Sequence, residues 1–162
     1  MFRLVSDSNL VLVDWITSGR HANGENWDFE LYKSINNLYL EDDHPLFLDT
    51  VLLEKRTIQT IAERMQDYQA IAMLILFGPK LREIQKHVQE NVKNMMSEQL
   101  QISYGSRNNF MKPEFIASCS TFGPEGKGVV VRIASDSTEF VYNFLRQQLA
   151  ELEPLLGQSP YA

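Results

Sequence analysis

A carboxylate interrupts an apolar stretch near the start of the 162-residue chain. Residues 10–16 read Leu-Val-Leu-Val-Asp-Trp-Ile, so Asp14 stands among six apolar side chains. Burying an isolated carboxylate is costly unless it has a partner. Two roles fit this pattern. Either Asp14 is held by Arg20 or by backbone donors in the bend that follows, or it lines a hydrated channel with Glu25 and Asp49.

The bend after this stretch contains two glycines and two opposite charges. Gly19-Arg20 precedes Gly24-Glu25 by a few residues. Glycines in so short a connection indicate a positive φ or a close approach of the backbone. The simplest interpretation is that Arg20 and Glu25 form a partly buried bidentate ion pair that fixes the turn. Gly19, Arg20 and Gly24 are therefore expected to have structural roles.

Other residues with chemical potential lack the spacing that their chemistry needs. His21, His44 and His87 show no metal-ligand spacing among themselves. The single cysteine, Cys119, allows no internal disulfide, and its strand context favours an inert buried thiol. Residues 123–128 read Gly-Pro-Glu-Gly-Lys-Gly, without the Ser/Thr of a phosphate-binding loop, so they predict a hairpin turn.

Composition and charge narrow the class of protein. The chain is 44% hydrophobic and 22% charged, which is typical of a soluble globular domain. Its net charge is −6 and it has no basic run, which argues against nucleic acid or an anionic membrane as a partner. The longest apolar run is 70–77, far shorter than the ~20 residues that span a bilayer. The sparse cysteine and the absence of a signal-peptide pattern favour the cytoplasm.

The elements that must position these residues begin with strands. Residues 10–16 predict a strand covered on both faces, because they are almost wholly apolar. Residues 27–32 alternate, with Trp27, Phe29 and Leu31 on one face, and predict a half-buried strand. A turn at 42–45 leads into another buried strand over 46–53.

The remainder of the chain alternates helices and strands. The pattern predicts, in order, a short helix over 57–65, a core strand over 69–77, an amphipathic helix from Pro79 to about Gln99, a loop over 103–112, strands over 114–121 and 129–134, and a final helix whose capping box pairs Asp136 with Glu139. The whole of 1–162 is therefore expected to be a single domain. The expected fold class is α+β and β-rich. Residues 1–56 form an all-β part, and residues 57–162 form a short helix followed by a β-α-β-β-α unit.

The order of several motifs resembles the UreD family of urease accessory proteins, called UreH in some bacteria. The matching segments are the apolar stretch ending in Asp14 with its Gly-Arg and Gly-Glu pairs, Glu-Asp-Asp-His-Pro-Leu-Phe-Leu-Asp at 41–49, Ile-Leu-Phe-Gly-Pro at 75–79, Val-Val-Arg-Ile-Ala at 130–134 and Leu-Leu-Gly-Gln-Ser-Pro at 155–160. The wording at 41–45 is most similar to plant members. Family members are about twice as long, so the chain is expected to correspond to a C-terminal half.

This resemblance implies a non-enzymatic metallochaperone. In the family, UreD binds UreF, which recruits the GTPase UreG, and the assembly docks on apo-urease to insert nickel. The family fold consists of stacked antiparallel sheets, like a short β-helix, with two main α-helices. Nickel is then a transient cargo, and weak single carboxylates suit its release. On this hypothesis Asp14, Glu25 and Asp49 belong to the nickel path or brace it.

Two other readings remain open on the sequence. A small hydrolase could use Asp14 and Glu25 as paired carboxylates, which requires both in one pocket. Alternatively, the chain could be an inert or dominant-negative fragment that still binds UreF.

Overall fold

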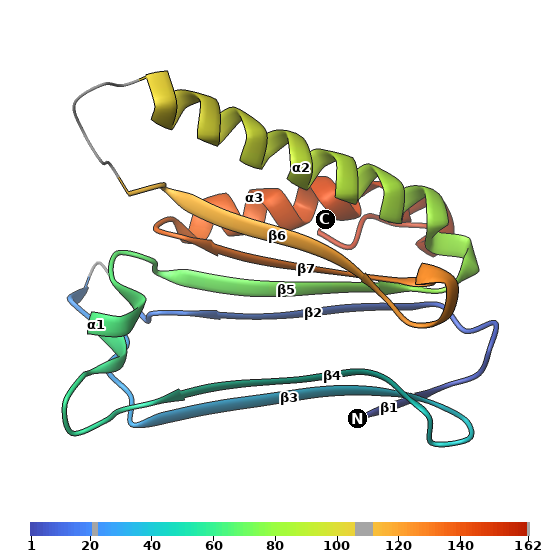
Figure 1. The fold of residues 1–162 in the computed structure, drawn as a ribbon, viewed down its shortest axis with the longest axis horizontal. Coiled ribbons are helices and arrows are strands. Elements are labelled where there is room, and N and C mark those ends of the chain that lie inside the picture. Colours follow the sequence, from blue (N-terminus) through green and yellow to red (C-terminus); the bar gives the residue numbers. More distant parts are fainter. Residues whose placement is uncertain (21–22, 106–111, 162) are drawn as a thin grey trace.

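The elements of the protein lie in three layers. The computed structural model describes residues 1–20, 23–105 and 112–161, with only the backbone described at 102–105. A three-stranded sheet, a four-stranded sheet and a helical layer are stacked in that order (Figure 1). The elements, with η marking 3-10 turns, are β1 (Phe2–Leu4), β2 (Leu10–Thr17), β3 (Leu31–Leu40), β4 (Pro45–Glu54), α1 (Ile61–Met65), β5 (Ala70–Phe77), η2 (Pro79–Leu81), α2 (Arg82–Gly105), β6 (Phe115–Phe122), η3 (Pro124–Gly126), β7 (Gly128–Ser135), α3 (Thr138–Leu149), η4 (Ala150–Leu152) and α4 (Glu153–Leu156). These stacked, mainly antiparallel sheets with two long helices confirm the expected α+β class.

The four-stranded sheet forms the middle layer. Its order is β2-β5-β7-β6, and every neighbouring pair is antiparallel. β5 is apolar on both faces because both faces are covered. Leu74 and Leu76 pack towards the helices, whereas Ile75 and Phe77 pack towards the other sheet. The early strand β2 pairs with β5 along its whole length, from Leu10 to Thr17.

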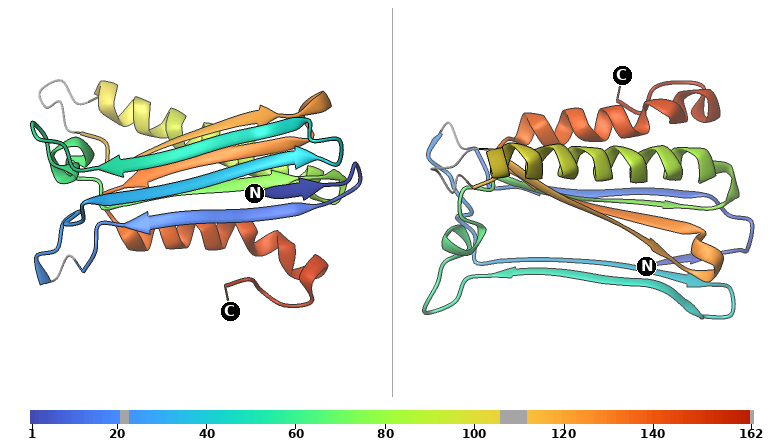
Figure 2. Two further views of the ribbon diagram at one scale, coloured as in Figure 1. Left: turned by 90° about the horizontal axis from the view of Figure 1, so that it is seen from below. Right: turned by 45° about the horizontal axis from the view of Figure 1, so that its top comes forward.

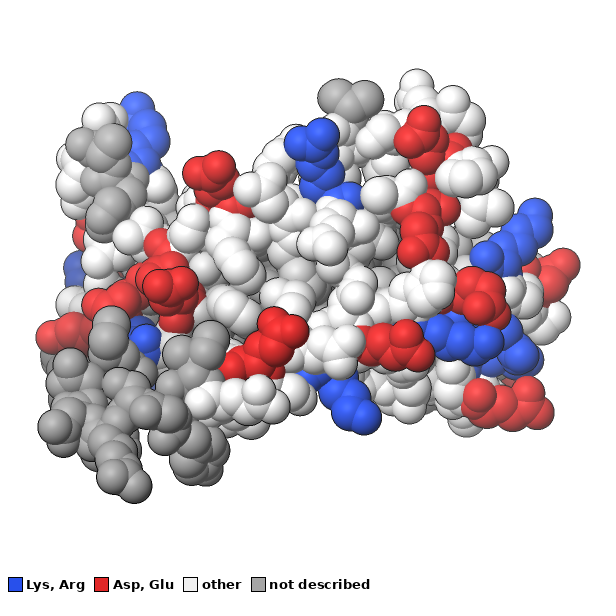
Figure 3. Space-filling model, turned by 90° about the horizontal axis from the view of Figure 1, so that it is seen from above, with Lys and Arg blue, Asp and Glu red and all other residues white. Residues whose placement is uncertain are grey.

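The helices cover one face of this sheet (Figure 2). The spacing of apolar residues on α2 and α3 brings one stripe of each helix onto the sheet, as their periodicity predicts. The buried residues of these stripes are Ile84, Val88 and Val92 on α2 and Val141, Phe144, Leu145 and Leu149 on α3. On the helix-covered side, acidic and basic side chains of the described residues are interspersed (Figure 3). Among the described residues, no helix is both long enough and apolar enough to cross a bilayer.

The three-stranded sheet covers the opposite face of the middle layer. β3 and β4 form an antiparallel pair, and the short β1 runs parallel to the end of β3. Leu4, Leu38 and Leu46 point inward from these strands and join Ile75 and Phe77 in a second hydrophobic cluster. The space between the two sheets is thus a packed core at this end of the strands.

The alternating stretch at 27–32 does not form the predicted strand. β3 begins only at Leu31, and Trp27 has a φ of 58°. The Trp27 side chain is buried, and its Nε1 donates a hydrogen bond of 2.9 Å to the carbonyl of Tyr68. Burial and hydrogen bonding of the Trp27 indole therefore determine the backbone conformation here, rather than the alternating apolar pattern that predicted a strand. As a result Tyr32 turns inward and Leu31, at 58% exposed, turns outward, which is the reverse of the predicted facing.

The predicted burial of the strand at 46–53 is wrong for one of its faces. The strand itself forms, as β4, and Phe47 packs inward. Its outward residues Leu48 and Leu52 are 58% and 48% exposed. Among the described residues, no element covers the outward face of this sheet. The apolar run in the sequence could not show this.

Helix ends differ from the sequence expectations where side chains cap them. Thr60 and Glu63 form a reciprocal capping box, so α1 starts after residue 60 rather than at 57. The cap of α3 is Ser137, whose hydroxyl oxygen accepts a hydrogen bond from the Phe140 amide. The predicted capping box at 136 and 139 is therefore wrong. α2 continues to Gly105, so residues 103–105 of the predicted loop are helical, and 106–111 lie outside the described residues.

Replacing Leu74 with alanine tests the central role of β5. Leu74 is 1% exposed between the middle sheet and the helices. The lost burial and the cavity should lower the free energy of unfolding by about 2–5 kcal/mol, measured by chemical denaturation. The matched control is Leu52→Ala, at an outward position, which should stay within about 0.5 kcal/mol of wild type. Equal losses in the two variants would contradict the layer assignment.

Candidate functional site

Asp14 is held by three polar side chains of the facing sheet. Its carboxylate accepts hydrogen bonds from Tyr32, Ser34 and Asn36, which are successive inward-facing residues of β3. The Tyr32 hydroxyl lies 3.4 Å from Oδ1, and Nδ2 of Asn36 lies 2.6 Å from Oδ2. The Ser34 hydroxyl also donates to Oδ2. All three donors are uncharged, so these bonds orient the carboxylate without neutralising it.

The donors around Asp14 are themselves constrained. Asn36 is buried, and its amide also donates to the Ser34 hydroxyl over 3.2 Å. Desolvation raises the pKa of Tyr32 above its usual value, and the negative charge of Asp14 raises it further. Tyr32 therefore remains a neutral donor at physiological pH. The network fixes one carboxylate between the two sheets.

A second carboxylate faces the same space between the sheets. Asp49 lies on β4 opposite Asn36 in the strand register. Its Oδ1 accepts a hydrogen bond of 2.8 Å from Nη2 of Arg132 on β7, whose guanidinium lies over the Phe47 ring. The Asp49 side chain is only 10% exposed, and its Oδ2 has no hydrogen-bond partner among the described residues. One buried carboxylate oxygen is thus left without a donor.

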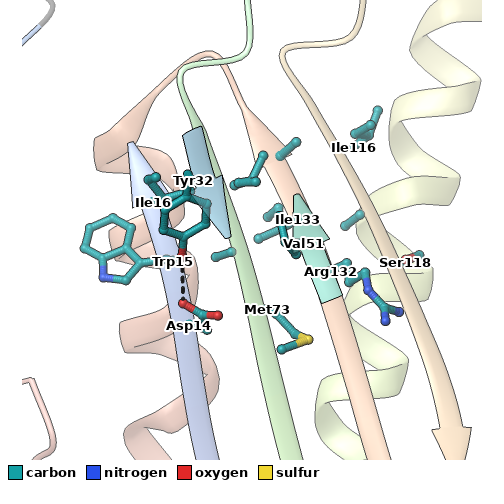
Figure 4. Close-up of a pocket in the computed structure, with 14 residues that line it drawn as sticks. Asp14, Trp15, Ile16, Tyr32, Val51, Met73, Ile116, Ser118, Arg132 and Ile133 are labelled. Carbon is teal, nitrogen blue, oxygen red and sulfur yellow. Dashed lines mark hydrogen bonds between the residues drawn. The ribbon is translucent and has the colours of Figure 1, made fainter. Parts of the chain in front are cut away.

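A pocket of about 320 Å³ opens between the two sheets beside these groups (Figure 4). Asp14, Met73, Arg132 and Ser118 occupy one row across β2, β5, β7 and β6, as the strand register shows. With strands about 4.8 Å apart, the backbones of Asp14 and Arg132 are about 10 Å from each other. Apolar residues form most of the remaining lining, among them Ile16, Val51, Ile71, Ile116 and Ala134. The pocket therefore presents one anion and one cation within apolar walls.

The glycine-containing bend forms the predicted ion pair, but at the surface. Nε and Nη2 of Arg20 donate to Oε1 of Glu25 over 3.0 Å and 2.7 Å, and the Arg20 amide donates to Oε2 over 2.8 Å. These bonds from Arg20 lower the pKa of Glu25. The φ angles of Gly19 and Gly24 are positive, 115° and 81°, as glycine at these positions predicts. The Arg20 side chain is 78% exposed and that of Glu25 is 37% exposed, so only the Glu25 half of the pair is partly buried as expected.

The structure separates the three proposed metal residues into two groups. Asp14 lines the pocket, and Asp49 pairs with the pocket residue Arg132 between the sheets without lining the pocket itself. Glu25 belongs to the surface bend and does not line the pocket either. The donors to Asp14 come from β3, and the described side-chain bonds of Arg20 go to Glu25. No group of three or more His, Cys, Asp or Glu side chains within the described residues is placed to hold a metal ion.

Sequence reasoning missed the partners of both carboxylates. Tyr32, Ser34 and Asn36 are spaced two residues apart, so they share one face of a strand. This polar alternation could have indicated a strand face that supplies hydrogen-bond donors to the carboxylate in the apolar stretch. Arg132 is likewise a lone cation in an apolar strand. Neither signal identifies its partner, because the paired residues are far apart in sequence.

The Arg20–Glu25 pair predicts a pH-dependent contribution to stability. Because Arg20 lowers the pKa of Glu25 in the folded state, ionised Glu25 stabilises the fold above the ordinary glutamate pKa. That gain is lost as the pH falls through the lowered folded-state value. Thermal melting should therefore show Glu25→Gln below wild type at neutral pH, with a small difference that closes in strong acid and shrinks in high salt. A difference that persists in acid would contradict this account.

Comparison with known proteins agrees with the motifs. The family model "UreD urease accessory protein" matches residues 1–162. Urease accessory protein D of Arabidopsis thaliana is 85% identical over 171 aligned residues, covering 100% of this chain and 58% of that protein. Its counterpart in Oryza sativa subsp. indica is 52% identical over 99% of this chain and 55% of its own length. UreD of Sorangium cellulosum is 33% identical over 98% of this chain and 45% of its own length.

The chain thus spans a little over half the length of the plant relatives that it matches. The match nevertheless extends over every residue of this chain, including the strands that carry Asp14, Asp49 and Arg132. The chain belongs to the UreD family of urease accessory proteins.

Proposed function

We propose that this chain serves in urease maturation as part of a metallochaperone scaffold that helps insert nickel into apo-urease in the cytoplasm. Its partners on this proposal are UreF, UreG and apo-urease, and its role is binding and transfer rather than catalysis. Membership of the UreD family supports the urease-maturation part of the proposal. The nickel part draws its support from the carboxylates between the two sheets.

The observation that carries the nickel proposal is the pair of carboxylates in one gap. Asp14 accepts hydrogen bonds from neutral donors, and Asp49 has one buried oxygen without a donor among the described residues. An oxygen of this kind is suited to a cation, because its lone pairs are not used by a hydrogen-bond donor among the described residues. Single carboxylates bind a divalent ion weakly compared with a cluster of ligands. Weak binding is what a protein that releases its cargo requires.

Arg132 competes with the cargo for Asp49. Its guanidinium pairs with Asp49 when no metal is bound, which offsets the cost of burying that carboxylate. The Arg132 side chain is 49% exposed, so it has space to leave Asp49 towards solvent. On this proposal, nickel entry replaces the Arg132 contact and nickel release restores it. The exchange keeps the carboxylate paired at both stages.

Glu25 has a bracing role in this proposal. Its bonds to Arg20 close the bend that joins β2 to β3, the two strands that carry Asp14 and its donors. A stable bend helps to hold Asp14 opposite Tyr32 and Asn36. A hydrolase that uses Asp14 and Glu25 together has no support here, since Glu25 does not line the pocket that Asp14 lines.

Urease activation with neutral isosteres tests the proposal. The 162 residues are placed in a full-length plant UreD context, and urease is co-expressed with UreF and UreG. Asp14→Asn and Asp49→Asn should each lower the nickel content and activity of urease roughly tenfold, the effect expected when a group that holds or orients a metal is lost. The matched control is Glu98→Gln on the exposed side of α2, which should leave both unchanged.

Co-purification with UreF separates loss of transfer from loss of assembly. Both Asn variants keep the side-chain size, so they should retain the wild-type yield of complex with UreF. Wild-type nickel content of urease in both variants would remove these carboxylates from the path. Loss of the UreF complex in either variant would instead assign that residue to structure.

A further inference from the structure

The bend that joins β2 to β3 contains an Asn-Gly pair, Asn23-Gly24, the one such pair in the sequence. Both residues are exposed. The φ angle of Gly24 is 81°, and a Cβ atom at this position would meet no other atom within 4 Å. The pair thus borders open space, and Gly24 places no side chain beside its own backbone nitrogen.

The side chain of Asn23 is not held by the rest of the described structure. Its amide group makes no hydrogen bond to a side chain or backbone group of the described residues. Asn9 shows the contrast, since its side-chain oxygen accepts a hydrogen bond of 2.8 Å from the Lys80 amide. The backbone N–H of Asn23 is fixed by donation to the Arg20 carbonyl over 2.8 Å. The Asn23 side chain can therefore rotate while its backbone stays in place.

A free Asn side chain that precedes Gly can react with the backbone, because the two groups are held close together within one chain. The Gly24 nitrogen attacks the side-chain carbonyl carbon (Cγ) of Asn23, and a C–N bond forms. Nδ2 leaves as ammonia, taking the proton of the Gly24 N–H, and the product is a cyclic succinimide. Water then opens the ring. Cleavage at Cγ gives aspartate, whereas cleavage at the main-chain carbonyl carbon gives isoaspartate, in which the main chain continues through Cβ and Cγ.

We propose that Asn23 is a site of spontaneous deamidation in the folded protein, through a succinimide formed with Gly24. The bend is suited to this reaction because its base is fixed while the Asn-Gly pair is exposed. At the base, the Trp27 N–H donates to the Ser18 carbonyl over 2.8 Å, and the buried Trp27 indole anchors the chain. Exposed segments of small and polar residues between fixed elements are where local opening costs least.

Deamidation of Asn23 acts on the contacts that close the bend. It adds a carboxylate beside the Arg20–Glu25 pair, and isoaspartate also adds an extra atom to the main chain between these two residues. The Arg20 amide donates to Oε2 of Glu25 over 2.8 Å, and the Glu25 amide lies 3.4 Å from the Arg20 carbonyl. Both contacts span position 23. The modification therefore alters the charge and the geometry of the segment that follows the strand carrying Asp14.

Ageing of the 162-residue chain at neutral pH and body temperature tests the proposal. Trypsin then releases residues 21–33, which contain both Asn23 and Asn26. Asn26 is a matched control within the same peptide, because the next residue, Trp27, is buried and its N–H is bonded to Ser18. Electron-transfer fragmentation in a mass spectrometer locates each conversion and distinguishes isoaspartate from aspartate.

Conversion at Asn23 should exceed conversion at Asn26 by at least about tenfold, with isoaspartate as the main product. The free tryptic peptide, aged in the same buffer, gives the rate without a fold, and the rate in the protein should lie within about tenfold of it. A smaller preference for Asn23, a slower rate in the protein, or aspartate as the sole product would each overturn the proposal.

Asn23→Gln tests the site by a second measurement. Glutamine keeps the polarity of the side chain but has to close a larger ring, so its cyclisation is slower. An isoaspartyl methyltransferase, with S-adenosylmethionine as the methyl donor, reports isoaspartate in the intact protein. The aged Asn23→Gln variant should take up at least about tenfold fewer methyl groups than the aged wild type. A smaller difference would place the isoaspartate at another residue and contradict the proposal.

Discussion

Burial of β5 on both faces is the constraint on which the other layers depend. The strand contains no charged residue, and its side chains point alternately to the helices and to the three-stranded sheet. An apolar strand of this kind is stable only when two layers exclude water from it. The helical layer and the three-stranded sheet supply that cover. β2 and β7 in turn take their positions by pairing with β5.

The two carboxylates acquire their properties from this arrangement. Because one side of β2 and β7 faces the inter-sheet gap, Asp14 and Arg132 project into apolar surroundings, where charges need partners. The facing sheet brings three neutral donors to Asp14 and one carboxylate, Asp49, to Arg132. The gap combines apolar walls with oriented polar groups, and one oxygen of Asp49 has no hydrogen-bond donor among the described residues. The proposed handling of nickel rests on that oxygen.

Each sheet in this protein has apolar side chains on both faces, and every such face except the outer one is covered by a described element. The middle sheet shows the effect of cover on both faces, since its strand β5 contains several of the fully buried side chains, among them Leu74, Ile75 and Leu76. The stack of two sheets and a helical layer therefore accounts for the ordered carboxylates, while Leu48 and Leu52 stay exposed on its outer face.

Long periodic segments of the sequence determined the elements themselves. The strands at β2, β4, β5, β6 and β7 and the two long helices follow from hydrophobic spacing, and the glycines of the bend predicted their positive φ angles. The sequence also placed Asp14 in an apolar strand and Arg20 beside Glu25. These features depend on interactions between residues close together in the chain. The order of the motifs along the chain can also be read without the structure, and it identified the family.

Only the tertiary structure decided which residues meet. Asp14 with Asn36, Asp49 with Arg132, and Trp27 with the Tyr68 carbonyl are contacts between residues 22, 83 and 41 positions apart. Local pattern reasoning failed where such contacts prevailed, as at Trp27, whose burial replaced the expected strand by a bend. Local pattern reasoning also could not distinguish the covered face of β4 from its exposed face. The spacing of apolar residues in one strand does not show which other layers pack against it. Sheet pairing and layer stacking bring distant segments together, and that is a property of the whole fold.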